Sequence, residues 1–213
     1  MPEVFLNFIT DPKVLFYIAT YFVGGIPFGL LLAKYYANVD IKEAGSKSIG
    51  ATNVLRVVKE KDPKLAKKLA IATVALDALK GVVMLLIAML LGFSQSALWL
   101  VAILALVGHC FSPYLNFEGG KGIATGAGVL LVLLPIETVI AAVVWFVSGK
   151  IFKISSVASL LALTSLVVSS FIIHPQMPEV YSHTPLIIIC IIIVYKHIPN
   201  IVRLLKKEEK KVV

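Results

Sequence analysis

Long apolar runs recur along this chain of 213 residues, and they constrain its fold more than any other feature. A helix needs about 20 mainly apolar residues to cross a bilayer, and inside a helix every backbone polar group finds its partner. The chain is 59% apolar and only 15% charged, which excludes an ordinary soluble domain. The sequence predicts an all-α, polytopic membrane bundle. Its clearest runs are Val14–Ala37, Leu69–Gly92, Ala97–Phe111, Val157–Ile173 and Leu186–Tyr195.

The N-terminal segment does not have the pattern of a signal peptide. Met1–Lys13 contains Glu3 and Asp11 but no basic residue before Lys13. A signal peptide begins with a basic region, so the first apolar run is expected to stay in the mature protein. We expect one domain over residues 1–213, ending in a charged tail, 203–213, that is solvated or frayed.

Two of the apolar runs contain helix breakers. Pro27, after two glycines, should kink the first run. Pro135 and Glu137 divide Gly122–Val147 into halves that are each too short to cross with ease. We predict two short, tilted helices there, forming a hairpin, which brings the bundle to about seven crossings. The last run is short unless Lys196–Val202 continues it.

The distribution of charge predicts an orientation. The net charge of +8 indicates membrane topology, not nucleic acid binding. With seven crossings, the polar segment Asn38–Lys68, the loops Gly119–Lys121 and Gly149–Lys153 and the basic tail share one side. Of the 20 Lys and Arg, only Lys13 lies on the other side. The positive-inside rule makes the basic side cytoplasmic, with the N-terminus outside. A single crossing over Gly122–Val147 would break this pattern.

A glycine-lysine loop precedes that hairpin. In the run Asn116–Gly128, glycines allow close backbone approach, and a helix starting at Gly122 would present free N–H groups to an anion. Lys121 adds a positive charge. The loop fails the Walker A pattern, because Lys121 is followed by glycine and not by Ser or Thr, so nucleotide hydrolysis is disfavoured. Tight helix packing is the alternative role for these glycines.

Other polar residues are expected near the same face. Ser46, Asn53 and Arg56 lie in a small-residue segment that can approach a phosphate, or that forms a flexible loop whose arginine snorkels. Asp77 and Lys80 lie inside an apolar run, three residues apart, as a functional pair or a structural ion pair.

The histidines and serines leave further alternatives open. His109 could act as a base, a phosphate donor or a polar cap. Ser155 starts a helix, as a cap or a ligand, and His197 and Asn200 share a helix face if Pro199 permits. Cys110 and Cys190 show no metal-binding spacing, and we expect no disulfide and no metal.

The order of these motifs resembles the bacterial integral-membrane acyl-phosphate:glycerol-3-phosphate acyltransferase family over nearly the whole chain. The resemblance rests on five groups: Gly45-Ser46 with Gly50–Asn53 and Arg56; Asp77 with Lys80-Gly81; Gly108-His109 with Phe117 and Gly119–Gly122; Ser155–Ser159; and His197 with Asn200-Ile201 and Arg203. The chain departs from the family at Lys47-Ser48-Ile49, where Gly-Asn-Pro is usual, at Glu118, where a basic residue is common, and after His197.

The resemblance implies an inner-membrane enzyme with its site at the cytoplasmic face. It implies transfer of a fatty acyl group from acyl phosphate to the 1-hydroxyl of glycerol 3-phosphate, giving lysophosphatidic acid and phosphate, without metal or cofactor. We expect a monomer among membrane lipids. The residues carried over as catalytic are His197, Asn200, Ser46 and Lys121; those expected to bind substrate are Ser46, Asn53, Arg56, Lys80, His109, Gly119, Gly120, Lys121, Gly122, Ser155, His197 and Asn200.

Two other classes compete with an enzyme. Broken spans and intramembrane Asp and Lys also occur in transporters, so a transporter for an organic phosphate is the alternative. Transporters place polar groups in both halves of the membrane, whereas the polar clusters here are predicted on one side. A structural subunit would leave those clusters unexplained.

Overall fold

The computed structural model describes residues 10–211, and all regular structure in that range is helical. Within it, six helical stretches are long and apolar enough to cross a membrane. They are Pro12–Ala37, Pro63–Leu90, Gln95–Leu115, Pro135–Phe152, Ser155–Ile173 and Thr184–Leu205. Ile123–Leu133 is a shorter apolar helix, so the described residues contain six candidate spans where about seven crossings were predicted. The predicted polytopic helical bundle is therefore confirmed.

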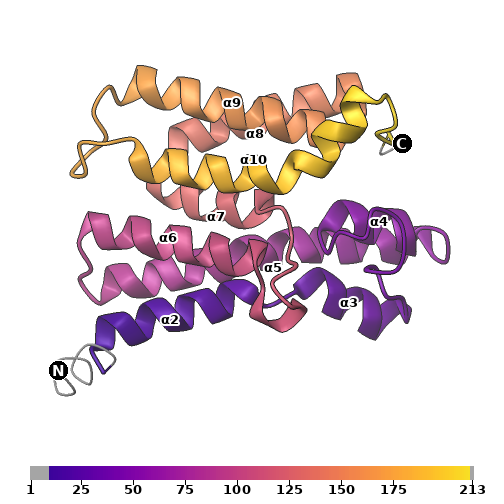
Figure 1. The fold of residues 1–213 in the computed structure, drawn as a ribbon, viewed down its shortest axis with the longest axis horizontal. Coiled ribbons are helices and arrows are strands. Elements are labelled where there is room, and N and C mark those ends of the chain that lie inside the picture. Colours follow the sequence, from indigo (N-terminus) through magenta and orange to yellow (C-terminus); the bar gives the residue numbers. More distant parts are fainter. Residues whose placement is uncertain (1–9, 212–213) are drawn as a thin grey trace.

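The helices lie in two layers joined by a short central helix (Figure 1). One layer holds α2 (Pro12–Gly25), α3 (Phe28–Ala37), α4 (Ala51–Val58), α5 (Pro63–Leu90) and α6 (Gln95–Cys110). The other layer holds α8 (Pro135–Phe152), α9 (Ser155–Ile173) and α10 (Thr184–Leu205), and α7 (Ile123–Leu133) lies between the layers. A 3-10 turn, η1 (Pro113–Leu115), follows α6. The α5–α6 and α9–α10 connections lie at the left end of Figure 1, and α4 and the C-terminus lie at the right.

Proline sets both predicted breaks. The first span divides at Ile26-Pro27 into α2 and α3, because proline cannot continue the hydrogen-bond ladder. The second break falls at Leu134, and Pro135 starts α8 at a position where its missing N–H costs nothing. The two tilted helices predicted after the glycine loop are thus α7 and α8, although α8 is longer than expected.

Small residues allow α7 to lie close to α5. A side-chain carbon added at Gly128 would come within 2.6 Å of the Ala78 carbonyl oxygen, and one at Gly81 within 2.7 Å of Val129. Neither position leaves room for a larger side chain. The helix-packing role predicted for the glycines therefore applies to Gly128, and the same close approach fixes the depth of α7 in the bundle.

Two hydrophobic clusters hold the bundle together. The larger one joins α5, α6, α7, α9 and α10, with Leu106 and Ile189 fully buried. The smaller one joins α3, α4 and the start of α5 around Ile41 and Val54. The second cluster gives the polar segment between α3 and α4 a core of its own, so this segment is held against the end of the bundle.

The C-terminal helix differs from its expected length. α10 runs from Thr184 to Leu205 with Pro199 inside it, so the apolar run does continue beyond Tyr195. The tail was expected to be solvated or frayed, and up to Glu209 this is wrong. The chain turns at Lys207, which has a φ of 59°, and the Glu208 N–H donates to the Arg203 carbonyl oxygen at 2.8 Å. The tail therefore folds back on its own helix.

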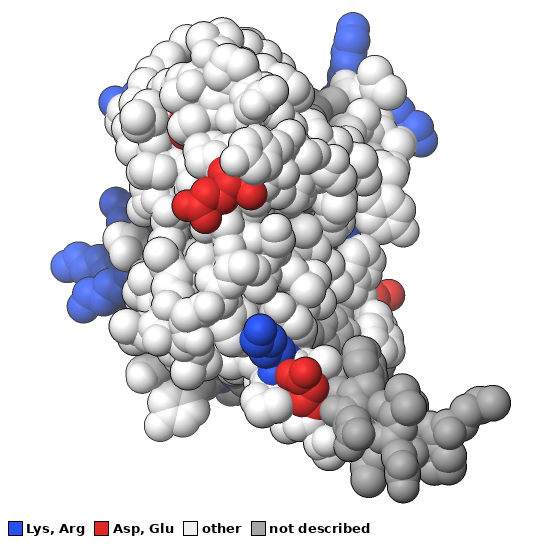
Figure 2. Space-filling view, turned by 90° about the vertical axis from the view of Figure 1, so that its left-hand side faces the viewer, with Lys and Arg blue, Asp and Glu red and all other residues white. Residues whose placement is uncertain are grey.

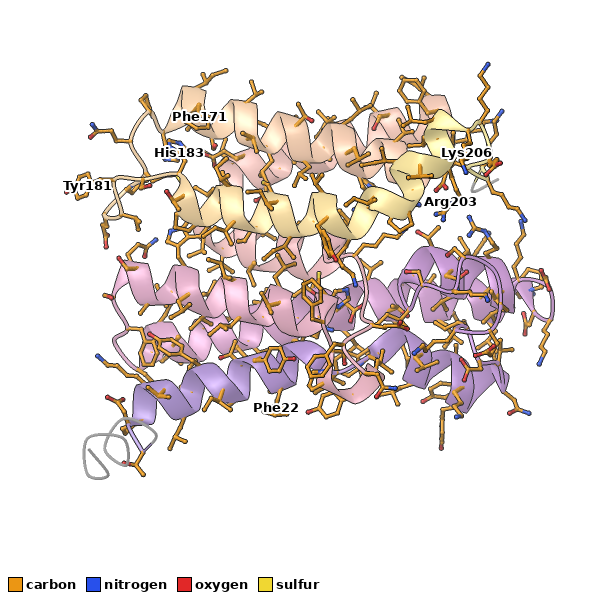
Figure 3. The ribbon with its side chains drawn as sticks, in the orientation of Figure 1. Phe22, Phe171, Tyr181, His183, Arg203 and Lys206 are labelled. Atoms are coloured by element: carbon orange, nitrogen blue, oxygen red, sulfur yellow. The ribbon has the colours of Figure 1, made fainter. Side chains whose placement is uncertain are left out.

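The two ends of the bundle differ in charge. Figure 2 shows the left-hand end of Figure 1 as a face that is mostly uncharged. Near this end Phe171 stacks on His183 with ring centroids 3.9 Å apart (Figure 3), and His174 Nδ1 lies 2.5 Å from the buried Glu137 carboxylate. Five lysines lie between α4 and the first turns of α5, at the opposite end: Lys59, Lys61, Lys64, Lys67 and Lys68.

Candidate active site

A cavity of about 430 Å³ opens between the two layers. One part of its wall is polar and comes from α4 and the segment before it, the end of α6, the start of α7, the start of α9 and the end of α10. It gathers nine of the residues predicted from the sequence: Ser46, Asn53, Arg56, His109, Lys121, Gly122, Ser155, His197 and Asn200. Lys80, Gly119 and Gly120 are not among the lining residues.

Asn53 organises the segment that carries Ser46. Its side-chain N–H groups donate to the carbonyl oxygens of Ile41, Ala44 and Ser48, at 2.9 to 3.1 Å. Its side-chain oxygen accepts the Ser46 N–H at 2.8 Å. A buried amide with both its ends used in this way fixes a loop. Asn53 therefore shapes the wall of the cavity, and its predicted contact with substrate stays a prediction.

Asp77, Lys80 and His109 form a buried polar group at the wall of the cavity, and Asp77 and His109 line it. The Lys80 amino group donates to the Asp77 carboxylate at 2.8 Å, to the Ile26 carbonyl oxygen at 2.9 Å and to His109 Nδ1 at 2.9 Å. An ammonium group has three N–H donors, so all of them are engaged. The predicted pairing of Asp77 with Lys80 is confirmed. It also ties α5 to the break between α2 and α3 and to the end of α6.

Gly119 and Gly120 pack against His109. A side-chain carbon at Gly120 would come within 2.2 Å of His109 Nε2, and one at Gly119 within 2.0 Å of the His109 carbonyl oxygen. Their N–H groups donate to the carbonyl oxygens of Cys110 and His109, at 3.1 and 2.9 Å. These two N–H groups are therefore not free to hold an anion, and the glycines instead allow the loop to lie on the histidine.

The second half of the glycine loop does reach the cavity. Gly122 has a φ of 83°, which favours glycine, and the residues from Lys121 to Ala124 line the wall. The N-terminus of α7 therefore faces the cavity, where its free N–H groups favour an anion. Burial lowers the pKa of the Lys121 amino group to about 8; Glu209 opposes this, and Arg203 and Arg56 add to it.

His197 and Asn200 come from one face of α10, as their spacing predicted. Both side chains are buried and line the cavity. His197 Nδ1 lies 2.8 Å from the Ile193 carbonyl oxygen, which can only accept a hydrogen bond, so Nδ1 carries the proton. In the neutral ring, Nε2 is then the hydrogen-bond acceptor. The Asn200 side-chain N–H donates to Glu209 at 2.6 Å.

Three further polar features of the cavity were missed or undervalued in the sequence. Glu209 and Lys210 line it, although the tail gave no local signal beyond its charge. Ser156 lines it beside Ser155 and donates to Glu209 at 2.9 Å. The hydroxyl oxygens of Thr52 and Ser155 lie 3.3 Å apart, which links α4 to α9. Only the fold brings these segments together.

The remaining wall of the cavity is apolar and passes between α7, α8 and α9. Small side chains such as Ala141, Ala142 and Ala162 leave this space open. Val74 on α5 and Trp145 on α8 also line the cavity, and their side chains are 49% and 43% exposed. The cavity therefore connects a polar, cationic chamber with the apolar surface of the helices.

The fold and this cavity define an integral membrane protein with a cationic chamber that continues into an apolar groove. Residues 14–207 match the family model described as glycerol-3-phosphate acyltransferase. A protein of that name from Nitratiruptor sp. is 65% identical over 97% of this chain and 99% of its own length; one from Campylobacter concisus is 62% identical over 94% and 99%.

Two solved structures are similar to the whole bundle. Both are crystal structures of PlsY (YgiH), an integral membrane glycerol 3-phosphate acyltransferase. The glycerol 3-phosphate form has a TM-score of 0.83 and 32% identity, over 94% of this chain and 96% of that one. The lysophosphatidic acid form has a TM-score of 0.79 and 31% identity, over 94% and 95%.

The chain belongs to the glycerol-3-phosphate acyltransferase family. The predictions of the family, of an acyltransferase and of a helical membrane fold are thereby confirmed. The comparisons support the enzyme over the transporter. Among residues 10–211, no three His, Cys, Asp or Glu side chains are grouped as a metal site would need.

Proposed function

We propose that the acyl donor is acyl phosphate and that the cavity holds both substrates of one direct transfer. The acyl carbonyl of a mixed anhydride is already activated, so the glycerol hydroxyl can attack it without a covalent enzyme intermediate. The C–O bond to the hydroxyl forms, the bond between the acyl carbon and the phosphate oxygen breaks, phosphate leaves with the electron pair, and the hydroxyl proton ends on the departing phosphate. Positioning and electrostatic stabilisation then supply most of the rate.

The single observation that carries this proposal is the continuity of the cavity. Its cationic chamber holds Lys121, Arg56 and the N-terminus of α7, which suit phosphate groups. Its apolar part, lined by residues such as Leu130, Leu163 and Leu166, suits a fatty chain. An amphiphile with a phosphate head fits this shape, and the similar structures in glycerol 3-phosphate and lysophosphatidic acid forms support the same substrates here.

Most of the residues predicted from the sequence can then be given a role. Lys121, Arg56 and Ser46 hold phosphate oxygens, together with Ser155 and the start of α7. His197 Nε2 accepts a hydrogen bond from the attacking hydroxyl, and Asn200 orients the substrate beside it. Lys80 and the glycines Gly119 and Gly120 act by holding His109 in place, through the contacts described above.

The same proposal includes the setting of the enzyme. The cavity opens at the end of the bundle that carries the lysines between α4 and α5, so by the positive-inside rule this end faces the cytoplasm of a bacterial inner membrane. The N-terminus then lies outside. Because residues of one chain complete the cavity, the enzyme works as a monomer.

A two-donor assay tests the chemistry. The purified protein is given glycerol 3-phosphate with acyl phosphate or with acyl-CoA, and lysophosphatidic acid is measured. We expect product with acyl phosphate only. Lys121→Ala and Arg56→Ala should each lower kcat/KM at least a hundredfold, because a charged hydrogen bond to phosphate is lost. Lys64→Ala, an exposed lysine at the same end, is the matched control and should keep full activity. Formation of lysophosphatidic acid with acyl-CoA and not with acyl phosphate would overturn the assignment of the donor.

A further inference from the structure

The apolar groove is enclosed at the end farthest from the cationic chamber. Because α7 and α9 start at the chamber and α8 runs the opposite way, the deepest lining residues are Leu130 on α7, Thr138 on α8 and Leu166 on α9. All three side chains are buried, at 2%, 7% and 4% exposure. Trp145, seven residues nearer the chamber on α8, is 43% exposed. The groove is therefore open near the chamber and closed at its inner end.

The depth of the groove follows from the positions of its lining residues on α9. Ser155 at the chamber and Leu166 at the inner end lie eleven residues apart, or about 16 Å along the helix axis. The hydrocarbon core of a bilayer is about 30 Å thick, so one leaflet is about 15 Å. The helix α9 continues past Leu166 to Ile173, toward the mostly uncharged end of the bundle (Figure 1). The groove therefore stops inside the bundle, at about the depth of one layer of fatty chains.

A hydrogen bond joins two helices beside this inner end. Glu137 is the residue before Thr138, and its side chain is fully buried. Its carboxylate lies 2.5 Å from Nδ1 of His174, the residue directly after α9. The contact ties the start of α8 to the end of α9. The two helices cannot separate at the inner end of the groove without losing it.

Thr138 makes the inner end partly polar. Its hydroxyl oxygen is buried and has no hydrogen-bond partner within residues 10–211. A fatty chain that covers this oxygen offers it no partner either, which costs free energy. A chain that ends short of Thr138 is therefore favoured over one that presses against it.

We propose that Leu130, Thr138 and Leu166 form an end wall that sets the longest acyl chain that the enzyme transfers well, with Thr138 as the specificity-determining residue. This inference rests on the proposed function, which makes the groove the site of the fatty acyl chain. A chain that reaches the wall fills the groove. A longer chain must bend back or press against enclosed side chains, and overpacking of this kind lowers an equilibrium constant at least about fivefold.

Substitutions at two depths of the groove test the wall. Ala141 lines the groove on the same face of α8 as Thr138, three residues or about 4.5 Å nearer the chamber. An extended chain advances about 1.2 Å for each bond, so this step corresponds to about four carbons. Thr138→Leu should shorten the preferred chain, and Ala141→Leu should shorten it by about four carbons more. Thr138→Ala should have the opposite effect and admit longer chains.

The measurement is a profile of kcat/KM against chain length. Acyl phosphates of about ten to about eighteen carbons, or about 11 to 20 Å when extended, bracket the groove. In Thr138→Leu the ratio of kcat/KM for the longest chain to that for the shortest should fall at least about fivefold. In Thr138→Ala the same ratio should rise. General damage to the fold would lower kcat/KM at every length and leave the ratio unchanged.

Thr164→Leu is the matched control. It makes the same chemical change on α9, at an exposed threonine outside the cavity lining whose hydroxyl donates to the Leu160 carbonyl oxygen at 3.0 Å. Its length profile should match that of the unchanged protein. A shift in this control as large as that in Thr138→Leu would contradict the assignment of the wall.

Binding of n-alkyl phosphates separates the wall from the chemistry. These amphiphiles have a phosphate head and a chain but no acyl group to transfer, so calorimetric titration of the full-length protein in detergent needs no turnover. Micelles take up longer chains more strongly, so each Kd is compared with that of the unchanged protein at the same length. We expect the Kd values to show the same shifts in length preference as the kinetics.

The two experiments fail in different ways. The same length profile in the unchanged protein, Thr138→Leu, Thr138→Ala and Ala141→Leu would overturn the end wall, even if all four proteins make lysophosphatidic acid. If the unchanged protein makes no lysophosphatidic acid, the proposed function fails, while the titration with alkyl phosphates still decides whether the wall limits the chain.

Discussion

Lys121 shows how one residue can be both costly to bury and useful. Its amino group is buried in the chamber, with Arg203 and Arg56 nearby, so its charged form is less favoured than in water. The burial that lowers its pKa also removes competing water from a bound phosphate, which strengthens the interaction with a charged ligand. With a pKa of about 8, the residue stays mostly charged at neutral pH and loses its charge in the alkaline range.

This gives a pH prediction. With a pKa of about 8, Lys121 loses its proton as pH rises through that value, and the cation proposed to bind phosphate is lost. We expect kcat/KM for glycerol 3-phosphate to fall about tenfold for each pH unit above 8, since this parameter reports groups of the free enzyme.

Stability changes in the opposite sense: an unfolded lysine holds its proton up to its ordinary value of 10.5, so the free energy of unfolding rises between pH 8 and 10.5.

Lys121→Arg is the control for that profile. Arginine stays protonated throughout this range, so the variant should lose the inflection near pH 8, whatever its absolute rate. Lys64→Ala should keep it. A flat profile in the unchanged enzyme up to pH 10 would contradict the role given to Lys121.

Lys80 is the opposite case, because its ammonium group is fully occupied by partners within the protein. All three of its N–H donors have partners within 2.9 Å, and one partner is the Asp77 carboxylate. A sequence shows that a charged side chain lies inside an apolar run, but it does not show which groups form hydrogen bonds with that side chain. The pair was predictable from its spacing, whereas the contacts with Ile26 and His109 come from segments far away in the chain.

At the scale of elements, α7 depends on how closely it approaches α5. An added side-chain carbon at Gly128 would meet a backbone oxygen at 2.6 Å, and a backbone oxygen cannot rotate away. The start of α7 also lines the cavity, so a shift of this helix moves the anion site with it.

We therefore expect Gly128→Ala to destabilise the protein by about 1–3 kcal/mol, the usual cost of overpacking, and to lower activity. Thermal unfolding in detergent, followed by circular dichroism, measures the first effect, and the transfer assay measures the second. Gly149→Ala is the matched control in α8, because its added carbon would lie 3.7 Å from Ala158, an ordinary contact. Equal melting temperatures for the two variants would contradict the close contact of α5 and α7.

The elements themselves were largely predictable from the sequence. Pro135 marked the start of α8, and the apolar run placed α10, because proline chemistry and hydrophobic length act locally. The fold of Glu209 into the chamber was not predictable, since a charged tail has the same composition whether it is solvated or bound. The hydrogen bonds of the Gly119 and Gly120 N–H groups were not predictable either, because only the tertiary structure brings their acceptors to them.

At the scale of the whole molecule, the asymmetry of charge predicts the orientation. Gln176 is exposed in the connection between α9 and α10, and Lys64 is exposed at the start of α5, at the opposite end. With the proposed orientation, a membrane-impermeant maleimide should label Gln176→Cys in intact spheroplasts and label Lys64→Cys only after lysis.

The chain carries its own background control for this experiment. Cys110 and Cys190 are both buried, so the unsubstituted protein should show little labelling. Labelling of Lys64→Cys in intact spheroplasts, with Gln176→Cys protected, would reverse the orientation and place the cavity outside.

The nine predicted residues that line the cavity come from five separate parts of the chain. The order of these residues along the chain resembles that of a known family. This resemblance allowed the residues to be assigned to one site from the sequence alone. The geometry adds what order cannot: it shows that residues such as Asn53 and Lys80 use their hydrogen bonds to hold the wall in shape.

The opening of the apolar groove past Val74 and Trp145 has a consequence for the direction of flow. Glycerol 3-phosphate arrives from water, and once it carries a fatty chain the bilayer retains it by about 0.8 kcal/mol for each buried methylene, or about 8 kcal/mol for ten. A product that leaves sideways into the bilayer would be held there by this partition. In the proposed function, acyl transfer then also moves the glycerol phosphate from water into the membrane.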